Sequence, residues 1–213
     1  MNKVSCLIPA YNEEKTIFDV VSKVFELKKE NLISEIIVVS DGSKDKTPQL
    51  AKLAGADKVI ELSKNIGKSG SLLEAMKEAK GDIFLFLDAD LNGLKKEHIK
   101  LILEPVAKDV ADMVVGYIKD QLMINLSGQR AIKRYFLENL IKDEKVKKAR
   151  YNWEILVNRE IEKLGGKILY VHLPNLDHLK KTKKYKFHQA LIFKLQLAFG
   201  FLWFYLKNII SKP

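Results

Sequence analysis

Two aspartates one residue apart, Asp88 and Asp90, are the side chains of this sequence best suited to chemistry. They directly follow residues 83–87, which are apolar at every position and predict a buried strand. Carboxylates at the end of such a strand are costly unless they are paired or bind a cation. Their oxygens suit hard divalent ions such as Mg²⁺ or Mn²⁺, which also bridge phosphates. The alternative is that the pair caps a helix beginning near Lys95.

Polar side chains follow the other predicted strands as well. The segments are 9–14, 40–47, 65–70 and 175–178, and they include Glu13, Asp41, Lys68 and His178. The carboxyl ends of parallel strands meet at one edge of a sheet, and ligands of open α/β sheets bind there. We therefore expect these groups to converge with Asp88 on one rim.

The first half of the chain alternates short apolar runs with helical patterns. Strands are predicted over residues 4–8, 36–39, 58–62 and 83–87, and helices over 16–27, 47–54 and 69–79. Continuously apolar strands that alternate with helices form right-handed βαβ units in a parallel sheet. The predicted fold class is therefore α/β, with a mostly parallel sheet flanked by helices.

The second half is less regular. A strand is predicted over residues 112–117, helices over 129–140 and 152–164, and a last strand over 167–173. Gly165 and Gly166 end the second of these helices. Neither an internal repeat nor a Gly/Ser linker divides the sequence, which favours a single domain over residues 1–180.

The composition is that of a globular protein with excess positive charge. Of its 213 residues, 47% are hydrophobic and 30% are charged, and the formal net charge is +10. This excess favours anionic partners such as nucleotide phosphates, nucleic acid or an acidic membrane surface. Cys6 is the only cysteine, so no intrachain disulfide can form, and residues 4–8 are too short for a signal-peptide core. Together these observations predict a cytoplasmic protein.

Residues 181–213 are predicted to form a basic loop and a C-terminal apolar helix. Four lysines lie within residues 180–184, and residues 187–210 are rich in leucine and aromatic residues. A membrane-spanning helix needs about 20 largely apolar residues, whereas aromatic residues with a basic flank suit a helix that lies on the membrane surface. The protein would then be peripheral at the inner face of the cell membrane. The alternative is a helix packed on the domain or on a second copy in a homodimer.

Four motifs occur in a fixed order along the first half. They are Pro9-Ala10-Tyr11-Asn12-Glu13-Glu14, Asp41-Gly42-Ser43 continuing to Asp45 and Thr47, Gly67-Lys68, and Asp88-Ala89-Asp90. In this order and spacing they resemble family-2 glycosyltransferases, including relatives of the polyprenyl-phosphate and glucosyl-3-phosphoglycerate transferases. The resemblance is strong over residues 4–90 and thin beyond. It implies a GT-A fold and transfer of a sugar from a nucleotide-diphosphate sugar, a UDP- or GDP-sugar, with Mg²⁺ or Mn²⁺.

The resemblance also implies a role for each motif residue. Pro9, Ala10, Tyr11 and Glu13 would hold the nucleoside, with Glu13 on the ribose. Asp41 would accept from the base, and Lys68 would lie near the base or the diphosphate. The Asp88-Ala89-Asp90 motif would face the ribose and the metal, so that Asp90 takes part in catalysis. By their chemistry alone, Glu13 also suits a helix N-terminus and Asp41 an ordinary turn.

Acceptor residues are predicted in the second half by the same resemblance. Residues 126–131 are similar to an acceptor-side segment, so Gln129 and Arg130 would bind an anionic acceptor; alternatively, Arg130 is a solvated arginine at a helix start. Glu154 would be the base of an inverting reaction, or would only position a phosphate acceptor, and a retaining outcome stays open. In some GT-A enzymes a late histidine completes the metal site, as His178 would; otherwise it is a surface histidine.

Two rival functions follow from the same features. A nucleotidyltransferase that makes activated sugars uses a similar sheet, but its Gly-rich basic loop after the first strand is missing. A non-catalytic basic module is permitted by the charge, yet no nucleic-acid-binding signature is visible, so no nucleic-acid partner is expected. The acceptor is predicted to be a lipid phosphate at the membrane or a small anionic metabolite. Gly67-Lys68-Ser69 is no P-loop, because Leu62 stands where the earlier glycine would be.

Overall fold

The computed structural model describes residues 2–118, 124–143, 146 and 153–179. The chain divides into one compact unit, Met1–His178, and a second, Leu179–Pro213. The predicted basic loop and apolar helix of residues 181–213 lie outside the described residues. Among the helices of the described ranges, none is long and apolar enough to cross a membrane.

A seven-stranded sheet forms the centre of the first unit, in the order β3-β2-β1-β4-β7-β6-β8. Its strands are β1 (Val4–Ala10), β2 (Glu35–Ser40), β3 (Lys58–Glu61), β4 (Ile83–Phe86), β6 (Met113–Tyr117), β7 (Arg130–Lys133) and β8 (Ile168–His172). Only β7 runs antiparallel to its neighbours in this sheet, β4 and β6. Two short strands, β5 (Leu91–Asn92) and β9 (Asp177–His178), form a separate antiparallel pair.

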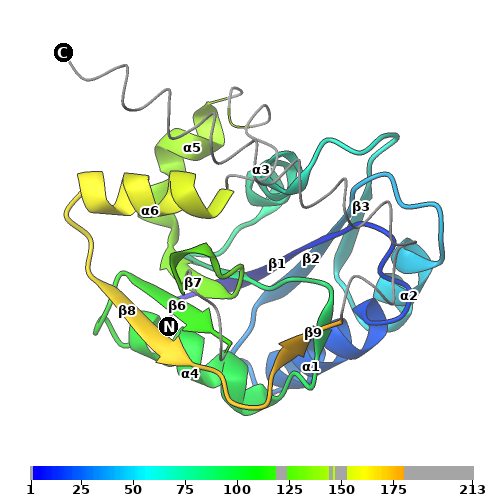
Figure 1. The fold of residues 1–213 in the computed structure, drawn as a ribbon, viewed down its shortest axis with the longest axis horizontal. Coiled ribbons are helices and arrows are strands. Elements are labelled where there is room, and N and C mark those ends of the chain that lie inside the picture. The colour runs from blue at the N-terminus through cyan, green and yellow to red at the C-terminus, as the bar shows by residue number, and fades with distance from the viewer. Residues whose placement is uncertain (1, 119–123, 144–145, 147–152, 180–213) are drawn as a thin grey trace. The chain divides into compact units, whose positions relative to one another are not determined.

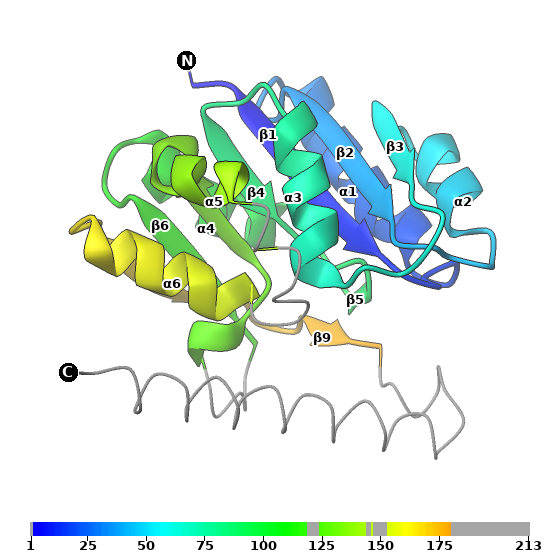
Figure 2. The same ribbon diagram turned by 90° about the horizontal axis from the view of Figure 1, so that it is seen from above.

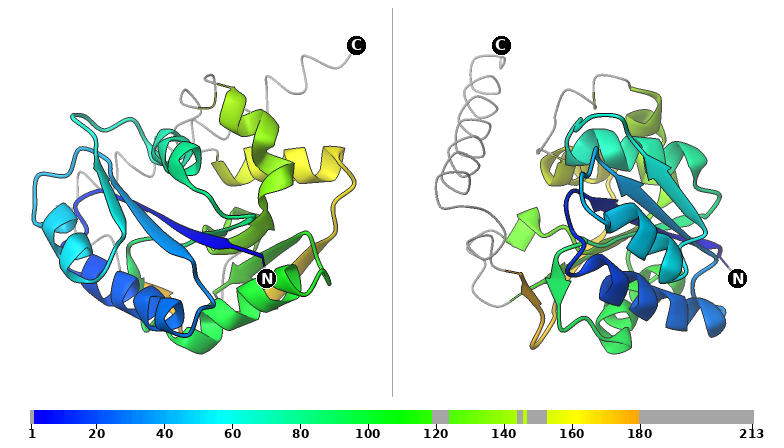
Figure 3. Two further views of the ribbon diagram at one scale, coloured as in Figure 1. Left: turned by 180° about the vertical axis from the view of Figure 1, so that it is seen from behind. Right: turned by 90° about the vertical axis from the view of Figure 1, so that its right-hand side faces the viewer.

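Helices cover both faces of the sheet, as Figures 1 and 2 show. On one face lie α1 (Ile17–Lys29), α2 (Thr47–Leu53) and α4 (Lys96–Ala107), and on the other α3 (Lys68–Glu78), α5 (Glu138–Lys142) and α6 (Trp153–Lys163). The views from behind and from the side in Figure 3 show the same layers. The predicted α/β fold with a mostly parallel sheet flanked by helices is therefore confirmed.

Alternation along the strands divides the core between the two faces. In β4, Ile83 and Leu85 join the apolar cluster under α1 and α4, whereas Phe84 and Phe86 join the cluster under α3 and α6. The ring of Trp153, which is 1% exposed, meets Phe86 edge to face with centroids 5.5 Å apart. Burying a large apolar side chain contributes roughly 2–3 kcal/mol. This contact fixes the start of α6, and with it the neighbouring Glu154, over the end of β4.

The predicted helix over residues 129–140 is wrong. Residues 130–133 form β7, residues 134–137 a 3₁₀ turn, and only Glu138–Lys142 is α-helical. Ala131 and Ile132 of β7 pack into opposite cores, and the strand hydrogen-bonds to β4 on one side and β6 on the other. Tertiary pairing on both edges outweighs the local helical pattern here, as often happens for a strand in the middle of a sheet.

Candidate active site

The loops that follow β1 and β2 are linked by hydrogen bonds. The Asn12 amide donates to Ser43 Oγ (3.1 Å), the Lys44 amide donates to Asn12 Oδ1 (2.9 Å), and the Glu13 amide donates to Thr47 Oγ1 (2.7 Å). Asn12 has a φ of 54°, a left-handed conformation that asparagine tolerates better than most residues. These bonds hold the segment that the sequence predicts to bind the nucleoside.

The side chains of this segment differ in their exposure. Pro9 and Ala10 end β1 beside Val39 and Ser40 of β2, and Tyr11 is 38% exposed. Glu13 is buried, with one carboxylate oxygen 3.4 Å from Thr16 Oγ1 at the start of α1. An exposed ring and a buried carboxylate side by side are compatible with a base and a ribose, and their roles stay predictions.

Asp41 binds the backbone of the loop before α3. Its two carboxylate oxygens accept from the amides of Ile66 (2.7 Å) and Gly67 (2.9 Å), and its own amide donates to the carbonyl of Ala10 (2.8 Å). Gly67 has a φ of 89°, which favours glycine. Asp41 therefore connects the ends of β1 and β2 to the start of α3. Both carboxylate oxygens of Asp41 already accept a hydrogen bond from a backbone amide, so the predicted contact with a base would use their remaining lone pairs.

Lys68, at the start of α3, is the central cation of the site. Its Nζ atom lies 2.6 Å from Asp88 Oδ1 and 2.6 Å from Glu154 Oε1. Burial alone would lower the pKa of Lys68, but the charges of Asp88 and Glu154 outweigh it and raise that pKa. Burial opposes ionisation of Asp88 as well, and the charges of Lys68 and His178 nevertheless hold the pKa of Asp88 below its ordinary value. The ammonium thus joins the predicted metal ligand to the predicted base.

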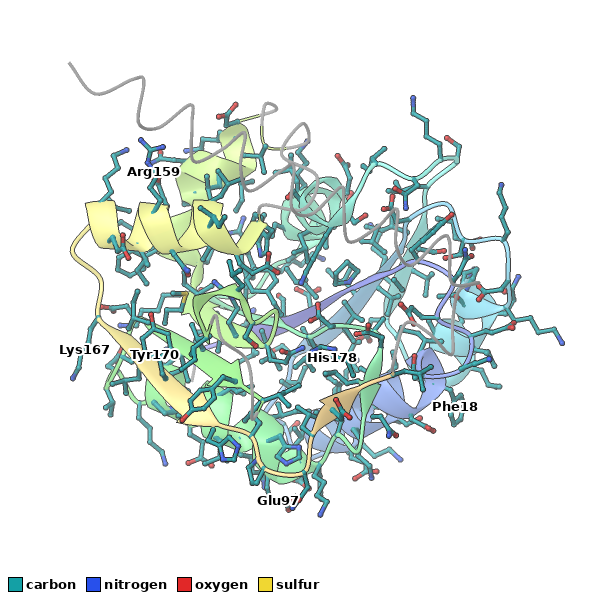
Figure 4. The ribbon with its side chains drawn as sticks, in the orientation of Figure 1. Phe18, Glu97, Arg159, Lys167, Tyr170 and His178 are labelled. Atoms are coloured by element: carbon teal, nitrogen blue, oxygen red, sulfur yellow. The ribbon has the colours of Figure 1, made fainter. Side chains whose placement is uncertain are left out.

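Asp90 and His178 meet although β9 lies far along the chain from Asp90. The β5–β9 pair sets Leu91 opposite His178, and His178 Nδ1 lies 3.0 Å from Asp90 Oδ1. Figure 4 shows His178 on β9. Burial would lower the pKa of His178, but the hydrogen bond to Asp90 and the charge of Asp88 raise it. Ala89, between the two aspartates, is buried in the core.

Asp88, Asp90 and His178 form a group that could hold a metal ion. One ligand atom from each lies within 4.8 Å of the others, and all three residues are half-buried. Two carboxylate oxygens and an imidazole nitrogen suit Mn²⁺, and the carboxylates also suit Mg²⁺. The donor set therefore fits the predicted divalent ion.

The two residues predicted to bind the acceptor, Gln129 and Arg130, are both fully buried. Gln129 Nε2 donates to Asp88 Oδ2 (2.8 Å). The Arg130 guanidinium donates to the carbonyl of Ser127 and to Asn158 Oδ1 of α6 (2.9 Å). Burial lowers the pKa of Arg130, while the charges of Glu154 and Asp88 oppose that shift. Contact with an acceptor stays a prediction for both residues and would require them to become accessible.

Sequence reasoning missed the support that Ser127 and Gly128 give to this site. A Cβ atom on Gly128 would lie 2.3 Å from Asp88 Oδ2, so the turn packs directly on the carboxylate. No local signal indicates that contact, because Gly128 and Asp88 are far apart in the chain and are brought together by the β4–β7 pairing.

Comparison with known proteins finds relatives that are named as sugar transferases. The chain is 35% identical over 122 residues to the dolichol-phosphate mannosyltransferase of Pyrococcus furiosus, covering 55% of this chain and 34% of that protein. It is 29% identical over 142 residues to the undecaprenyl-phosphate 4-deoxy-4-formamido-L-arabinose transferase of Pseudomonas fluorescens, covering 60% of this chain and 42% of the relative. The chain thus spans less than half of either relative.

A solved structure shares the fold. Glucosyl-3-phosphoglycerate synthase from Mycobacterium tuberculosis, in complex with Mn²⁺, uridine diphosphate and phosphoglyceric acid, matches with a TM-score of 0.70 at 23% identity. The match covers 84% of this chain and 71% of that one. Residues 5–164, most of the chain, match the family model described as glycosyl transferase family 2. The chain belongs to glycosyl transferase family 2.

Proposed function

We propose that this chain transfers a sugar from a nucleotide-diphosphate sugar, a UDP- or GDP-sugar, to an anionic acceptor with the help of Mn²⁺ or Mg²⁺. The observation that carries the proposal is the group of Asp88, Asp90 and His178, whose ligand atoms lie within 4.8 Å of one another. The Lys68 ammonium lies 2.6 Å from one of these carboxylates. A divalent ion beside a half-buried cation suits a diphosphate leaving group, whose developing negative charge both would stabilise.

The residues of the chain have distinct tasks in this reaction. Asp88, Asp90 and His178 would hold the ion, which when bound acts as a Lewis acid toward the leaving diphosphate. Pro9, Ala10, Tyr11, Glu13 and Asp41 would hold the nucleoside. Glu154 is 7% exposed, and its Oε1 atom is held by Lys68, so Oε2 is the oxygen that would accept a proton from an acceptor hydroxyl.

The acceptor is proposed to carry a phosphate. Two relatives are named for dolichol phosphate and undecaprenyl phosphate, and the structural neighbour was solved with phosphoglyceric acid. A phosphate group is the chemistry common to these three molecules. Transfer from the matching sugar nucleotide to a short-chain polyprenyl phosphate or to 3-phosphoglycerate, compared in one assay, distinguishes a lipid from a soluble acceptor.

Residues 181–213 are proposed to form a separate element that meets an anionic membrane surface, with residues 1–180 as the transferase domain. The lysines at 180–184 and the aromatic stretch that follows support a peripheral location. Co-sedimentation with vesicles containing phosphatidylglycerol tests the idea. A protein that stays in the supernatant and sediments as a dimer would favour a contact with a second copy instead.

Titration of a nucleotide panel into the protein tests the donor site. Binding of UDP, GDP, TDP and ADP is measured by calorimetry with and without Mn²⁺, on the wild type, on Asp90→Ala and on Asp82→Ala. Asp82 serves as the control because it precedes β4 at its other end, where it accepts from the Lys3 amide. We expect metal-dependent binding of one diphosphate that Asp90→Ala loses and Asp82→Ala keeps. Failure of every nucleotide to bind would contradict the proposal and favour a basic binding module.

A further inference from the structure

Gln129 and Lys68 contact different oxygens of the Asp88 carboxylate. Gln129 donates to Oδ2, and Lys68 donates to Oδ1. We propose that Gln129 is a positioning residue whose amide holds Asp88 in the orientation needed to bind the divalent ion. The proposal rests on the metal site of the proposed function and gives Gln129 a role other than acceptor binding. Three features of the described residues support this role: the amide contact, the anchored turn and the lack of room beside Asp88.

The amide contact is direct and buried. Gln129 is 0% exposed, and its Nε2 atom donates to Asp88 Oδ2 over 2.8 Å. Its Oε1 atom lies 2.7 Å from Ser127 Oγ, which can donate to it. A carboxylate only accepts hydrogen bonds, so the amide has one sensible orientation, with nitrogen toward Asp88 and oxygen toward the hydroxyl. The Nε2 atom of Gln129 is therefore directed to Asp88, while Gln129 Oε1 and the Gly116 carbonyl share the single proton of the Ser127 hydroxyl.

The buried side chain of Arg130 holds the turn that carries Gln129. Arg130 Nε and Nη2 both donate to the carbonyl of Ser127, over 3.1 and 2.5 Å, and its Nη1 donates to Asn158 Oδ1 of α6. The Ser127 hydroxyl also lies within hydrogen-bonding reach of the Gly116 carbonyl at the end of β6. A fully buried guanidinium with two of its donors on the Ser127 carbonyl and a third on α6 ties the turn that carries Gln129 to the rest of the domain.

Little room is left for Asp88 to rotate. Its Oδ1 atom is bound to Lys68 and its Oδ2 atom to Gln129, and the Cα of Gly128 packs against the carboxylate. Without the amide, Oδ2 loses its only described side-chain donor while the Lys68 ammonium still attracts the group. The carboxylate would then turn toward Lys68 and away from Asp90 and His178. Hydrogen-bond partners of metal-binding groups typically change metal affinity by roughly 10- to 100-fold when they are removed.

The test measures Mn²⁺ alone, without a sugar nucleotide. The dissociation constant of Mn²⁺ and the electron paramagnetic resonance spectrum of the bound ion are recorded for the wild type, Gln129→Leu, Ser127→Ala and Asn139→Ala. Asn139 is the matched control, since its amide also donates to a carboxylate, Glu160 Oε1 (2.9 Å), but between α5 and α6 away from the metal group. Thermal unfolding without metal shows whether each variant is folded.

We expect Gln129→Leu to raise the Mn²⁺ dissociation constant roughly 10- to 100-fold and to change the spectrum. Ser127→Ala keeps the glutamine but removes the hydroxyl beside its Oε1 atom, so it should raise the dissociation constant less. This variant provides the test if Gln129→Leu does not fold. Asn139→Ala should bind like the wild type. Wild-type affinity in both folded site variants would overturn the positioning role alone. A wild type that fails to bind Mn²⁺ would overturn the metal site of the proposed function as well.

Discussion

Asp90 Oδ1 and His178 Nδ1 lie 3.0 Å apart although the two residues are 88 positions apart in the chain. The contact depends on the two-residue strands β5 and β9, which set Leu91 opposite His178 and Asn92 opposite Asp177. The imidazole therefore reaches the metal group through a pairing that lies outside the main sheet.

Replacement of His178 by alanine is expected to weaken Mn²⁺ binding. The variant loses one of three protein donors, so the dissociation constant should rise by at least the roughly 10- to 100-fold that loss of a supporting residue costs. His172→Ala is the control, because this histidine of β8 stacks on Tyr117 and lies outside the group. Calorimetric titration of Mn²⁺ measures both. Equal Mn²⁺ affinities for the two variants would show that His178 is not a ligand of the metal ion.

Lys68→Met is expected to destabilise the fold and to abolish nucleotide binding. The variant leaves Asp88 and Glu154 facing each other with no cation between them, and breaking these largely buried ion pairs should cost about 2 kcal/mol. Lys133→Met is the matched control, since Lys133 also bridges two carboxylates, Asp109 (2.9 Å) and Asp112 (2.8 Å), near the surface.

The control variant Lys133→Met should lose no more than about 1 kcal/mol of its free energy of unfolding, because solvent screens the ion pairs of Lys133. Urea unfolding measures the free energy of unfolding of both variants, and calorimetry measures their affinity for the nucleotide that binds the wild type. Similar losses in stability would show that the Lys68 bridge is no more important to the fold than a surface pair.

Gly128→Ala is expected to impair the metal site through crowding. The added methyl group would lie 2.3 Å from Asp88 Oδ2, so the carboxylate or the turn must move, and such overpacking costs about 1–3 kcal/mol. Gly165→Ala is the comparison, with a positive φ of 69° but no atom within 4 Å of the new methyl. It should lose stability yet keep its Mn²⁺ affinity. Normal metal binding by Gly128→Ala would show that Asp88 has more freedom than the contact suggests.

The pH dependence of stability is expected to include a contribution from Asp112. Its carboxylate accepts from Lys133 Nζ (2.8 Å) and from the Lys167 amide (2.9 Å), and these bonds lower the pKa of Asp112. Because the folded pKa lies below the unfolded one, the stabilisation is present above the ordinary value of about 4 and is lost as pH falls through the folded pKa.

Asp112→Asn should therefore lower the free energy of unfolding at pH 7 by about 1 kcal/mol, and its difference from the wild type should shrink as pH falls below about 4. Glu61→Gln, which breaks the exposed pair with Lys52, should change little at either pH. Urea unfolding between pH 7 and pH 3 provides the comparison. A difference that grows in acid would contradict the sign of the Asp112 shift.

Much of the fold was predictable because most of the main sheet is built from local signals. Apolar runs indicated β1, β2 and β4, and helical spacing of apolar residues indicated α1 and α3. The strand β7 was not predicted, because its sequence contains no apolar run. It begins with Arg130, whose burial depends on hydrogen bonds to the carbonyl of Ser127 and to Asn158 of a later helix. Partners that distant leave no periodic pattern.

The site divides in the same way. Asp88, Lys68 and Asp41 were expected near one another because each follows or precedes an element that ends at the same rim. The contact of Gln129 with Asp88 spans 41 residues and two antiparallel strands, and the sequence predicted an acceptor contact instead. Whether a polar side chain faces a ligand or supports its neighbour is decided by packing, which spacing in the sequence does not reveal.

The late position of His178 has a consequence for biosynthesis. A ribosome that has made the chain through Asp90 has supplied two of the three proposed metal donors, and every residue of β7, α6 and β8 must follow before the third is made. The complete metal group therefore cannot assemble until synthesis has passed β9. Incomplete chains that stop before β9 would lack the full donor set even if their sheet had already formed.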